Sequence, residues 1–494
     1  MSLINAIQQH AINAPKTIAI SNGFKETLSY HDLHHEVMQM QTALKEDGNT
    51  SCLALALDNH PAWAVIDLAA AGNQLPIVPI PNFFSDQQIK HAISDAGANA
   101  LITDNPERFA DLLSYLITHK STITVAGKRL MRIQLRTPEP HLPLDTAKIT
   151  YTSGTTGQPK GVCLSNQAML CVASSIQKMV KLTTEDQHLC VLPLATLLEN
   201  VAGLYATLLA GGTAHIMSSD MVGLNGSSLN IHRLQQALND SKASTAILIP
   251  ELLSALVNTL ELSPTPFPHL RFLAVGGASV APDLLKRANK IGLPVFEGYG
   301  LSESASVVAL NTPHANKIGS VGQLLPHLQI RISDEKEILV KGASYLGYTQ
   351  EQQNNQEWLH TGDIGYLDEE GYLIINGRKK NIFITSFGRN VSPEWVERDL
   401  TNTPEIAQAC LFGEAKPWNT ALIVPSKGAT SEKITMAINQ INQQLPDYAK
   451  VGKWLLADEQ FSTDNQQLTP NGRLKRDVIW QQYQHAINTL YAST

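Results

Sequence analysis

Between residues 27 and 104, apolar positions switch repeatedly between helical spacing and short continuous runs. Leu33, Val37, Met40 and Leu44 recur every three or four residues, which predicts one buried helix face. The apolar run at residues 52–57 is short enough for a buried strand. This alternation predicts a largely parallel sheet with helices on its faces. Further helices are expected from Pro61 and from Ser85, which Gln88 helps to cap, and further strands at residues 76–80 and 100–102.

Beyond the first hundred residues the alternation pauses and then resumes. Residues 136–147 are rich in proline, and we expect them to link two sub-domains. Strand-like runs then follow at residues 189–192, 245–249 and 272–275, with helical stretches between them. This part of the chain continues the α/β pattern.

The pattern of apolar and polar residues changes near residue 319. From there to residue 376, short apolar runs alternate with turn residues. This pattern predicts a small antiparallel or barrel-like piece. A compact α+β segment of roughly 115 residues then closes the chain, within the usual size range of a domain. We therefore expect an α/β fold with an N-terminal domain at residues 1–377 and a C-terminal domain at residues 378–494.

Composition narrows the possible functions. The chain has 494 residues, enough for two or more domains, and 43% of them are hydrophobic. A net charge of −7 gives no overall basic footprint for nucleic acid. The five cysteines are scattered without a C-x-x-C pair, which argues against a disulfide framework or a zinc site. No signal peptide or transmembrane segment is visible, so we expect a cytoplasmic protein.

The strongest chemical signal is the loop at residues 152–161 (TSGTTGQPKG), which follows a strand-like run. Its glycines let backbone N–H groups approach phosphate oxygens, its hydroxyls donate hydrogen bonds, and Lys160 adds a positive charge. It is not a Walker loop, because Pro159 precedes the lysine and Gly161 follows it. By composition alone, a solvated loop without a ligand is the favoured interpretation.

The complete ten-residue string resembles the phosphate loop of the acyl-adenylate-forming superfamily. This superfamily includes acyl- and aryl-CoA synthetases, the adenylation domains of peptide synthetases and firefly luciferases, and the chain is most similar to long-chain fatty acyl-CoA synthetases. The resemblance covers nearly the whole sequence. It implies that the phosphates of ATP are bound by Thr152, Ser153, Gly154, Thr155, Thr156, Gly157 and Lys160.

Residues 297–304 (EGYGLSES) resemble the nucleotide segment of the same superfamily. Two glycines around an aromatic residue would by themselves predict only a turn. The resemblance implies that Tyr299, between Gly298 and Gly300, stacks near adenine, that Ser302 contacts the nucleotide and that Glu303 binds Mg²⁺. A carboxylate suits this last role, because magnesium prefers hard oxygen ligands and usually binds through one or two carboxylates plus phosphates.

Two later segments are similar to the family's ribose and hinge motifs. In residues 358–365 (WLHTGDIG), Asp363 would accept hydrogen bonds from the ribose hydroxyls. In residues 377–384 (GRKKNIFI), Arg378 would reach the ribose. Lys380 stands at the hinge, which implies a mobile C-terminal domain that swivels about it. Residues 388–394 resemble the loop that approaches the thiol tunnel in CoA ligases.

The acid site is expected where two further segments meet. Residues 192–200 (LPLATLLEN) resemble the segment that lines the acyl pocket, with Thr196 where many relatives have histidine. Residues 275–279 (VGGAS) resemble the segment beside the adenine and acyl pockets, although a plain strand-to-helix turn explains them nearly as well.

One motif departs from the family. Residues 468–476 (LTPNGRLKR) resemble the terminal motif that brings a catalytic lysine to the reacting atoms, but Arg473 holds that position. Arginine is larger and planar, so we expect adenylation to be slow and Arg473→Lys to accelerate it. The alternative is a pocket that has adjusted to arginine, in which lysine would be the worse residue.

The resemblance implies a two-step reaction with ATP, Mg²⁺ and CoA. A carboxylic acid, most simply a fatty acid, would attack the α-phosphate of ATP to give acyl-AMP, and a thiol would then take the acyl group. The residues implied in catalysis are Lys160, Glu303, Lys380 and Arg473. Three alternatives stay open: a carrier-protein phosphopantetheine as the acceptor, an aryl or other hydrophobic acid, and a non-catalytic nucleotide- or acyl-binding protein.

Overall fold

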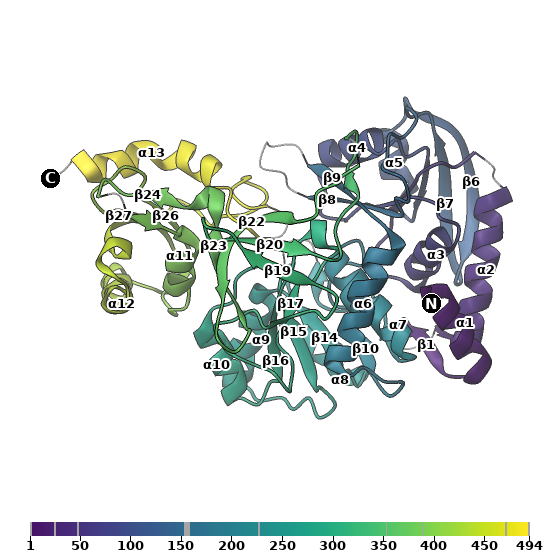
Figure 1. Ribbon diagram of the computed structural model, residues 1–494, viewed down its shortest axis with the longest axis horizontal. Helices are drawn as coiled ribbons and strands as arrows, with labels where there is room; N and C mark the ends of the chain where they lie inside the picture. The colour runs from purple at the N-terminus through teal and green to yellow at the C-terminus, as the bar shows by residue number, and fades with distance from the viewer. Residues whose placement is uncertain are drawn as a thin grey trace.

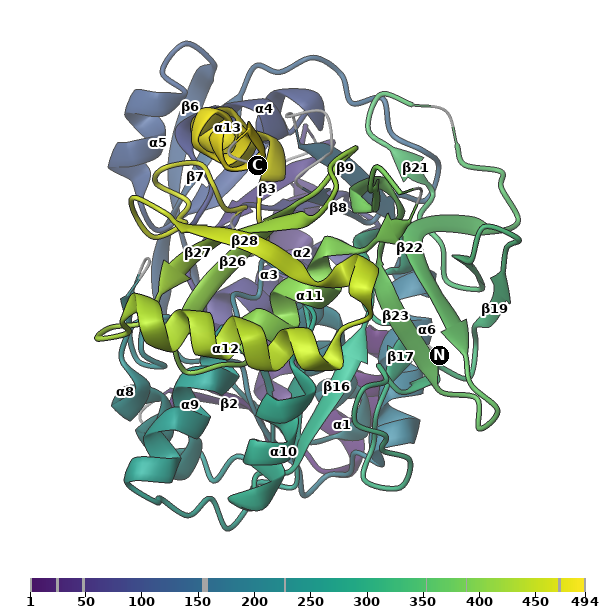
Figure 2. The ribbon, with the colours of Figure 1, turned by 90° about the vertical axis from the view of Figure 1, so that its left-hand side faces the viewer.

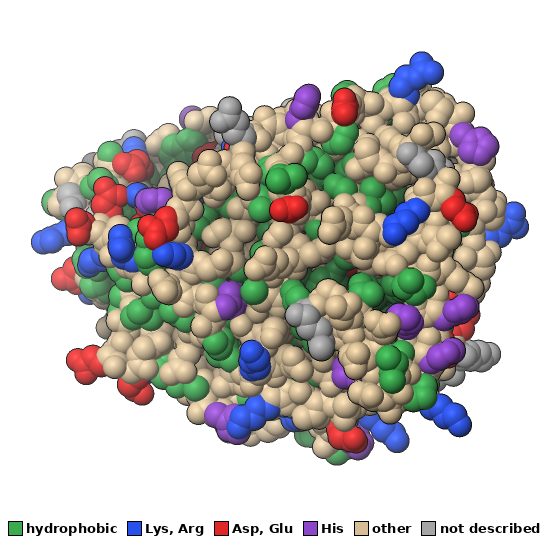
Figure 3. Space-filling model, turned by 45° about the vertical axis from the view of Figure 1, so that its right-hand side comes forward, with side chains coloured by type: hydrophobic (Ala, Val, Ile, Leu, Met, Phe, Trp, Pro, Cys, Tyr) green, Lys and Arg blue, Asp and Glu red, His purple; other side chains and the backbone are tan. Residues whose placement is uncertain are grey.

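The computed structural model describes residues 2–23, 26–46, 49–152, 159–225, 228–351, 353–387, 389–469 and 472–492. Two large mixed sheets and their helices form the N-terminal region, and a smaller body containing the C-terminus stands beside it (Figure 1). None of the helices in these ranges combines the length and apolarity needed to span a bilayer. On the face in Figure 3, basic side chains lie scattered among acidic ones and do not gather.

The first large sheet has eight strands in the order β21-β9-β8-β4-β3-β5-β7-β6. Its centre is parallel, as expected, but both edges are antiparallel. The capping box predicted at Ser85 and Gln88 starts α4. The bounds are β3 Leu53–Ala56, α3 Pro61–Gly72, β4 Ile77–Pro79, α4 Asp86–Asp95, β5 Ala100–Thr103, α5 Pro106–Leu112, β6 Ile117–Val125, β7 Lys128–Leu135, β8 Lys148–Thr152, β9 Lys160–Leu164 and β21 Gly347–Tyr348.

The second large sheet has nine strands in the order β18-β17-β16-β15-β14-β10-β11-β1-β2. Its core strands are parallel, and the chain's first strand, β1, pairs with β11. The strands are β1 Ile18–Ser21, β2 Thr27–Ser29, β10 Gln187–Leu189, β11 Thr213–His215, β14 Thr245–Leu248, β15 Phe272–Val275, β16 Val295–Tyr299, β17 Ala309–Leu310 and β18 Gln323–Leu324. The helices of this region are α1 Leu3–Asn13, α2 Tyr30–Glu46, α6 Asn166–Val180, the π-helix η1 Leu198–Tyr205, α7 Ala206–Ala210, α8 Ile231–Asp240, α9 Pro250–Leu262, α10 Pro282–Lys290 and the 3₁₀ turn η2 Ser302–Ser304, and a short hairpin pairs β12 Leu224–Asn225 with β13 Ser228–Leu229.

The proline-rich segment at residues 136–147 does not link two sub-domains, which corrects our expectation. It connects β7 and β8, which belong to the same sheet. The segment packs on the end of α4, where a Cβ added at Gly97 would lie 2.8 Å from the carbonyl oxygen of Pro138. The loop therefore stays with the first sheet, and the chain passes to the second sheet later, through α6.

A four-stranded antiparallel sheet follows, with β19 Gln329–Ile332, β20 Glu337–Lys341, β22 Leu359–Leu367 and β23 Leu373–Arg378. It is the antiparallel piece predicted from the short apolar runs. The C-terminal body contains η3 Lys379–Asn381, β24 Phe383–Ile384, β25 Asn390–Val391, α11 Pro393–Thr401, β26 Ile406–Phe412, β27 Asn419–Pro425, α12 Ser431–Gln444, η4 Asp447–Ala449, β28 Val451–Leu456 and α13 Arg476–Ala492.

In the C-terminal body, α11 and α12 lie beside one face of the sheet β26-β27-β28 and α13 beside the other (Figure 2). Each face has a hydrophobic cluster of its own. Leu411 and Ile423 pack with α11 and α12 on one face. Cys410 and Leu422 pack with α13 on the other. This alternation is the one that a strand with two buried faces requires. The predicted boundary at residues 377 and 378 falls at the end of β23 and stays a prediction.

A fully buried ion pair, Lys148 with Asp67, connects the two large sheets. Lys148 Nζ lies 2.7 Å from Asp67 Oδ1, and burial lowers the pKa of Lys148 while the carboxylate opposes that shift. Tyr205 donates its hydroxyl to Asp67 Oδ2 at 2.6 Å, and Asn200 bonds both charged groups. The group joins α3 and β8 of the first sheet to η1, which covers the second.

Candidate active site

A cavity of about 3460 Å³ opens between the large sheets and the C-terminal body. Its wall combines segments that are far apart in the sequence. Every described residue with a predicted site role lines it: Thr152, Lys160, Gly298, Tyr299, Gly300, Ser302, Glu303, Asp363, Arg378, Lys380 and Arg473. The sequence motifs therefore converge on one place in the fold.

Thr152 and Lys160 stand at the two ends of a hairpin, because β8 and β9 pair antiparallel with Thr152 opposite Lys160. The predictions for Ser153, Gly154, Thr155, Thr156 and Gly157 lie outside the described residues. Lys160 Nζ lies 4.9 Å from the centre of the Tyr348 ring and 3.8 Å from Glu351 Oε1. The Lys160 charge therefore lies over the face of the Tyr348 ring, at the end of the loop.

Asp363 forms the centre of a buried polar corner. Its Oδ2 accepts a hydrogen bond of 2.5 Å from the Tyr299 hydroxyl, and its Oδ1 lies 2.7 Å from Arg378 Nε. The register of β22 and β23 places Asp363 directly opposite Arg378. Burial raises the pKa of Asp363, while the Arg378 charge and the Tyr299 hydroxyl oppose that shift. The Tyr299 hydroxyl thus bonds Asp363, the residue that we predicted to bind the ribose.

The turn after Tyr299 is tight, and it presents Glu303 to the cavity. A Cβ added at Gly300 would lie 1.6 Å from the carbonyl oxygen of Ser306, so this position requires glycine. Ala305 and Ser306 adopt φ angles of 55° and 114°, the region in which L residues are strained. Such strain at a cavity wall is typical of functional sites.

Tyr348 connects Glu303 to the phosphate loop, and our sequence analysis missed it. Its hydroxyl donates to Glu303 Oε1 at 3.1 Å, and its strand, β21, pairs with β9 next to Lys160. The Tyr345 backbone N–H also donates to the Glu303 carbonyl at 2.8 Å. Gly347 and Tyr348 lie within residues 319–376, where the sequence showed only short apolar runs and turn residues. No local pattern therefore singled them out.

Arg473 enters the cavity from the C-terminal body. Its Nη2 donates to the carbonyl oxygen of Gly277 at 3.0 Å, across the gap to the large region. Reciprocal bonds with Thr469 close its own loop, one from the Arg473 backbone N–H to the Thr469 hydroxyl and one from the Thr469 backbone N–H to the Arg473 carbonyl. Burial and the nearby Arg378 lower the pKa of Arg473, and Asp363 opposes that shift.

Three cations converge at this end of the cavity: Arg378, Lys380 and Arg473. Burial lowers the pKa of Lys380, and repulsion from Arg378 and Arg473 adds to the shift. Positive charges gathered in one partly enclosed place favour an anionic ligand, because an anion relieves their mutual repulsion. The site can therefore accommodate phosphate and carboxylate oxygens together.

Arg476 fixes the loop that carries Arg473. It forms a buried bidentate ion pair with Glu397 of α11 and lies 3.9 Å from Glu394. Glu394 in turn accepts a hydrogen bond from Asn381 beside the hinge. Lys475, the lysine nearest Arg473 in the sequence, bonds Gln467 through its backbone N–H. The terminal loop is thus tied to the C-terminal body.

Among the described residues, one cluster of three possible metal ligands lies close together and buried, namely His188, Cys190 and Glu199. His188 Nε2 already pairs with Glu199 Oε1 at 2.7 Å, and its Nδ1 bonds Thr245 at 2.9 Å. The Leu192 N–H donates to the other Glu199 oxygen. These groups satisfy one another, and they hold η1 against the sheet.

Comparison with known proteins identifies the family. A family model described as AMP-binding enzyme matches residues 7–347, and another, described as AMP-binding enzyme C-terminal domain, matches residues 380–494. The chain belongs to the AMP-binding enzyme family. This confirms the superfamily predicted from the motifs. The roles predicted for single site residues stay predictions.

Two relatives of this AMP-binding enzyme differ in the acid that their names give. The chain is 26% identical to a long-chain-fatty-acid–CoA ligase of Mycobacterium bovis over 528 residues, covering 87% of this chain and 86% of that protein. It is 28% identical to a 2-succinylbenzoate–CoA ligase of Bacillus pumilus over 435 residues, covering 83% and 84%. The names of these relatives share the CoA ligase activity and differ in the acid.

A solved structure confirms the fold class of the AMP-binding enzyme. O-succinylbenzoate coenzyme A synthetase from Bacillus subtilis, in complex with ATP and magnesium ion, matches with a TM-score of 0.76 at 24% identity, covering 96% of this chain and 98% of that one. The predicted α/β class, with a large N-terminal part and a smaller C-terminal part, is therefore correct.

Proposed function

We propose that this AMP-binding enzyme is an AMP-forming acid–thiol ligase that joins a hydrophobic carboxylic acid, most simply a fatty acid, to CoA. The observation that carries the proposal is the position of Arg473. It reaches from the C-terminal body to Gly277, beside the corner formed by Asp363 and Arg378. A binding protein without chemistry would gain little from a cation held between the two parts of the chain at this point.

In the first step, a carboxylate oxygen attacks the α-phosphorus of ATP, a new P–O bond forms and pyrophosphate leaves. Asp363 and Arg378 would hold the ribose, and Lys160 with the adjoining loop would bind the outer phosphates. Arg473 would neutralise the carboxylate and the α-phosphate as they approach each other. Catalysis then consists of positioning and charge neutralisation, and no covalent enzyme intermediate is needed.

Glu303 fits the requirements of a magnesium ligand. Its Oε1 accepts the Tyr348 hydroxyl, the residue lines the cavity, and within the described ranges no hydrogen bond to its Oε2 is seen, so one hard oxygen is available for a metal. Bound Mg²⁺ would neutralise the charge of the leaving pyrophosphate. Tyr348 and the strained turn after Gly300 would hold the Glu303 carboxylate in position.

In the second step, the CoA thiol attacks the acyl carbon and AMP leaves with its bonding electrons. We propose that the C-terminal domain, residues 378–494, swivels about Lys380 between the two steps. Lys380 lies in η3, a single 3₁₀ turn between β23 and β24. A short turn between two folded parts is where a rotation can be taken up by few dihedral angles.

ATP–pyrophosphate exchange across a panel of carboxylic acids tests the proposal. We expect exchange that depends on the acid, on ATP and on Mg²⁺, followed by thioester formation when CoA is added. Incubation with a phosphopantetheine carrier protein in place of CoA tests the alternative acceptor. Absence of exchange with every acid would identify a binding protein and overturn the proposal.

Replacing the hinge residue should separate the two steps. We expect Lys380→Pro to form acyl-AMP at a rate within a few-fold of the parent and to transfer the acyl group at least about a hundredfold more slowly, because proline fixes φ near −65°. Lys380→Ala is the matched control, since it removes the same charge and leaves the backbone free. Equal loss of both half-reactions in the proline variant would contradict a two-position mechanism.

A further inference from the structure

One face of the nine-stranded sheet becomes less bulky toward the nucleotide site. Alternate residues of a strand share a face, so Phe272, Ala274 and Gly276 follow one another along β15 and its end. In the parallel register, Ile247 and Phe296 flank Ala274 on this face. Ala274 keeps part of its surface accessible although β15 is a central strand. A space that no side chain fills therefore lies in front of Ala274.

That space is a branch of the cavity, here called the side channel. Ala274 and Phe272 line it from the sheet, Leu198 and Ala202 line it from η1, and Ile176 and Val180 line it from α6. At the near end, Leu198 Cδ2 lies 4.0 Å from the position of a Cβ added at Gly276. The side channel thus runs along β15 from the glycines of the nucleotide corner toward Phe272.

The η1 wall of the side channel is fixed by buried polar contacts. Glu199 pairs with His188, and a Cβ added at Gly203 would lie 2.3 Å from Glu199 Oε1 and 2.4 Å from His188 Nε2. Asn200 and Tyr205 anchor the same helix to the Lys148–Asp67 pair. A π-helix is rare and often marks a functional site. This wall cannot shift far without leaving charges unpaired.

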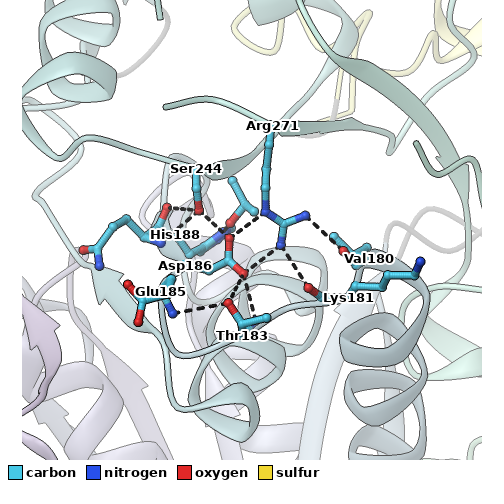
Figure 4. A network of polar contacts seen from close by, with 10 residues as sticks. Val180, Lys181, Thr183, Glu185, Asp186, His188, Ser244 and Arg271 are labelled. Carbon is cyan, nitrogen blue, oxygen red and sulfur yellow. Dashed lines mark hydrogen bonds and ion pairs between the residues drawn. The ribbon is translucent and has the colours of Figure 1, made fainter. Parts of the chain in front are cut away.

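The far end of the side channel is closed. The Phe272 ring stacks on Phe296, with centroids 5.0 Å apart and planes at 9°. Next to it, Arg271 forms a bidentate ion pair with Asp186 at 2.7 Å and donates to the carbonyl oxygens of Val180 and Lys181 at the end of α6 (Figure 4). Cations favour helix C-termini, so this clamp holds α6 against the sheet.

The six residues that line the side channel include no charged side chain. His188 and Thr245, which also line the cavity in the same row of the sheet as Phe272, bond each other, and His188 also bonds Glu199. The Arg271 guanidinium is directed to Asp186 and the helix carbonyls. A second carboxylate on the substrate would therefore meet no free cation there, and its burial would be costly.

We propose that the side channel holds the tail of an unbranched, medium-chain fatty acid and that Phe272 sets the limit of its length. The inference rests on the proposed function and names its acid. The four residue steps from Gly276 to Phe272 span about 13 Å at roughly 3.3 Å per residue. An extended alkyl chain with bonds of about 1.5 Å fills this length with about ten carbons.

The first test measures kcat/KM for acid-dependent ATP–pyrophosphate exchange with straight-chain acids from butanoic to octadecanoic, and with succinylbenzoic and decanedioic acids. We expect a maximum between octanoic and dodecanoic acid, and a loss of about tenfold for each carbon or two beyond it. A maximum at hexadecanoic acid or longer, or with either of the two dicarboxylic acids, would overturn the inference. Absence of exchange with all acids would instead refute the proposed function.

The second test changes the side channel itself. Ala274→Phe should move the maximum to hexanoic acid or shorter, and Ala202→Leu, from the η1 wall, should move it in the same direction. Phe272→Leu should improve hexadecanoic acid about tenfold relative to decanoic acid. Leu273→Met is the matched control, because Leu273 lies on the same strand and packs into the cluster on the other face.

AMP binding by calorimetry accompanies every variant, and an unchanged dissociation constant shows that the nucleotide site is intact. With that site intact, an unchanged acid profile in both Ala274→Phe and Ala202→Leu would overturn the inference. A shift in Leu273→Met equal to that of Phe272→Leu would overturn it too, since the effect would then come from the strand as a whole.

Discussion

Arg473→Ala should form acyl-AMP about a hundredfold more slowly than the parent in single turnovers, since loss of one positioned donor to a developing charge typically costs that much. Arg473 is the cation that the C-terminal body contributes at Gly277. Rapid-quench measurement of acyl-AMP with the best acid checks this. Transfer from supplied acyl-AMP to CoA should change by only a few-fold, because in the proposed mechanism the C-terminal domain has then swivelled away. Equal loss in both steps would contradict this role.

Arg473→Lys should be slower than the parent by about tenfold and faster than the alanine variant. The motif alone favoured the opposite result, and the contact with Gly277 reverses our expectation. Arginine can bond the Gly277 carbonyl with one nitrogen and still present its fork to the reacting oxygens. Lysine is a single point charge and cannot reproduce both contacts. A faster lysine enzyme would show that arginine is a handicap here.

Glu303→Gln should lower magnesium-dependent pyrophosphate release by about a thousandfold, because Mg²⁺ would lose a charged oxygen ligand beside the phosphates. Binding of AMP without the metal should stay within a few-fold, which separates metal loss from misfolding. Activity within a few-fold of the parent would show that the metal is held elsewhere.

Tyr348→Phe tests the support of Glu303. We expect the magnesium concentration at half-maximal rate to rise about tenfold, the usual cost of losing a group that orients a metal ligand. Tyr366→Phe is the matched control, because Tyr366 is an exposed tyrosine of β22 and its change is chemically the same. Equal shifts in both variants would contradict a specific role for the Tyr348 hydroxyl.

Local patterns predicted the elements of this fold well, because caps and apolar runs act over a few residues. The capping box at Ser85 and the strand at residues 272–275 formed where the pattern placed them. Long-range pairing was not readable in the same way. Nothing near β1 indicates that it joins β11, almost two hundred residues later, and the prolines at residues 136–147 suggested a boundary that does not exist.

The residues of the candidate site likewise fall into two groups, those that the sequence could indicate and those that depend on long-range pairing. The positions of Asp363 and Glu303 on the cavity could be predicted because their segments resemble motifs of the superfamily, while their roles stay predictions. Tyr348 could not, since its role comes from a two-residue strand that pairs with β9. The acceptor of Arg473 is a backbone carbonyl, that of Gly277, which has no sequence signature at all. Contacts that depend on backbone position or on sheet register therefore require the structure.

The buried Lys148–Asp67 pair limits how this enzyme can evolve. Removing one partner of a buried pair typically costs about 3–5 kcal/mol, a large share of a domain's stability. Because Asn200 and Tyr205 share the pair, mutations at these two positions of η1 are filtered out by folding before any change in substrate is selected. The Ala274 side chain forms no hydrogen bond or ion pair, so a change there leaves no buried charge unpaired. New acid preferences should therefore arise by substitutions on the sheet wall, while Asn200 and Tyr205 are retained.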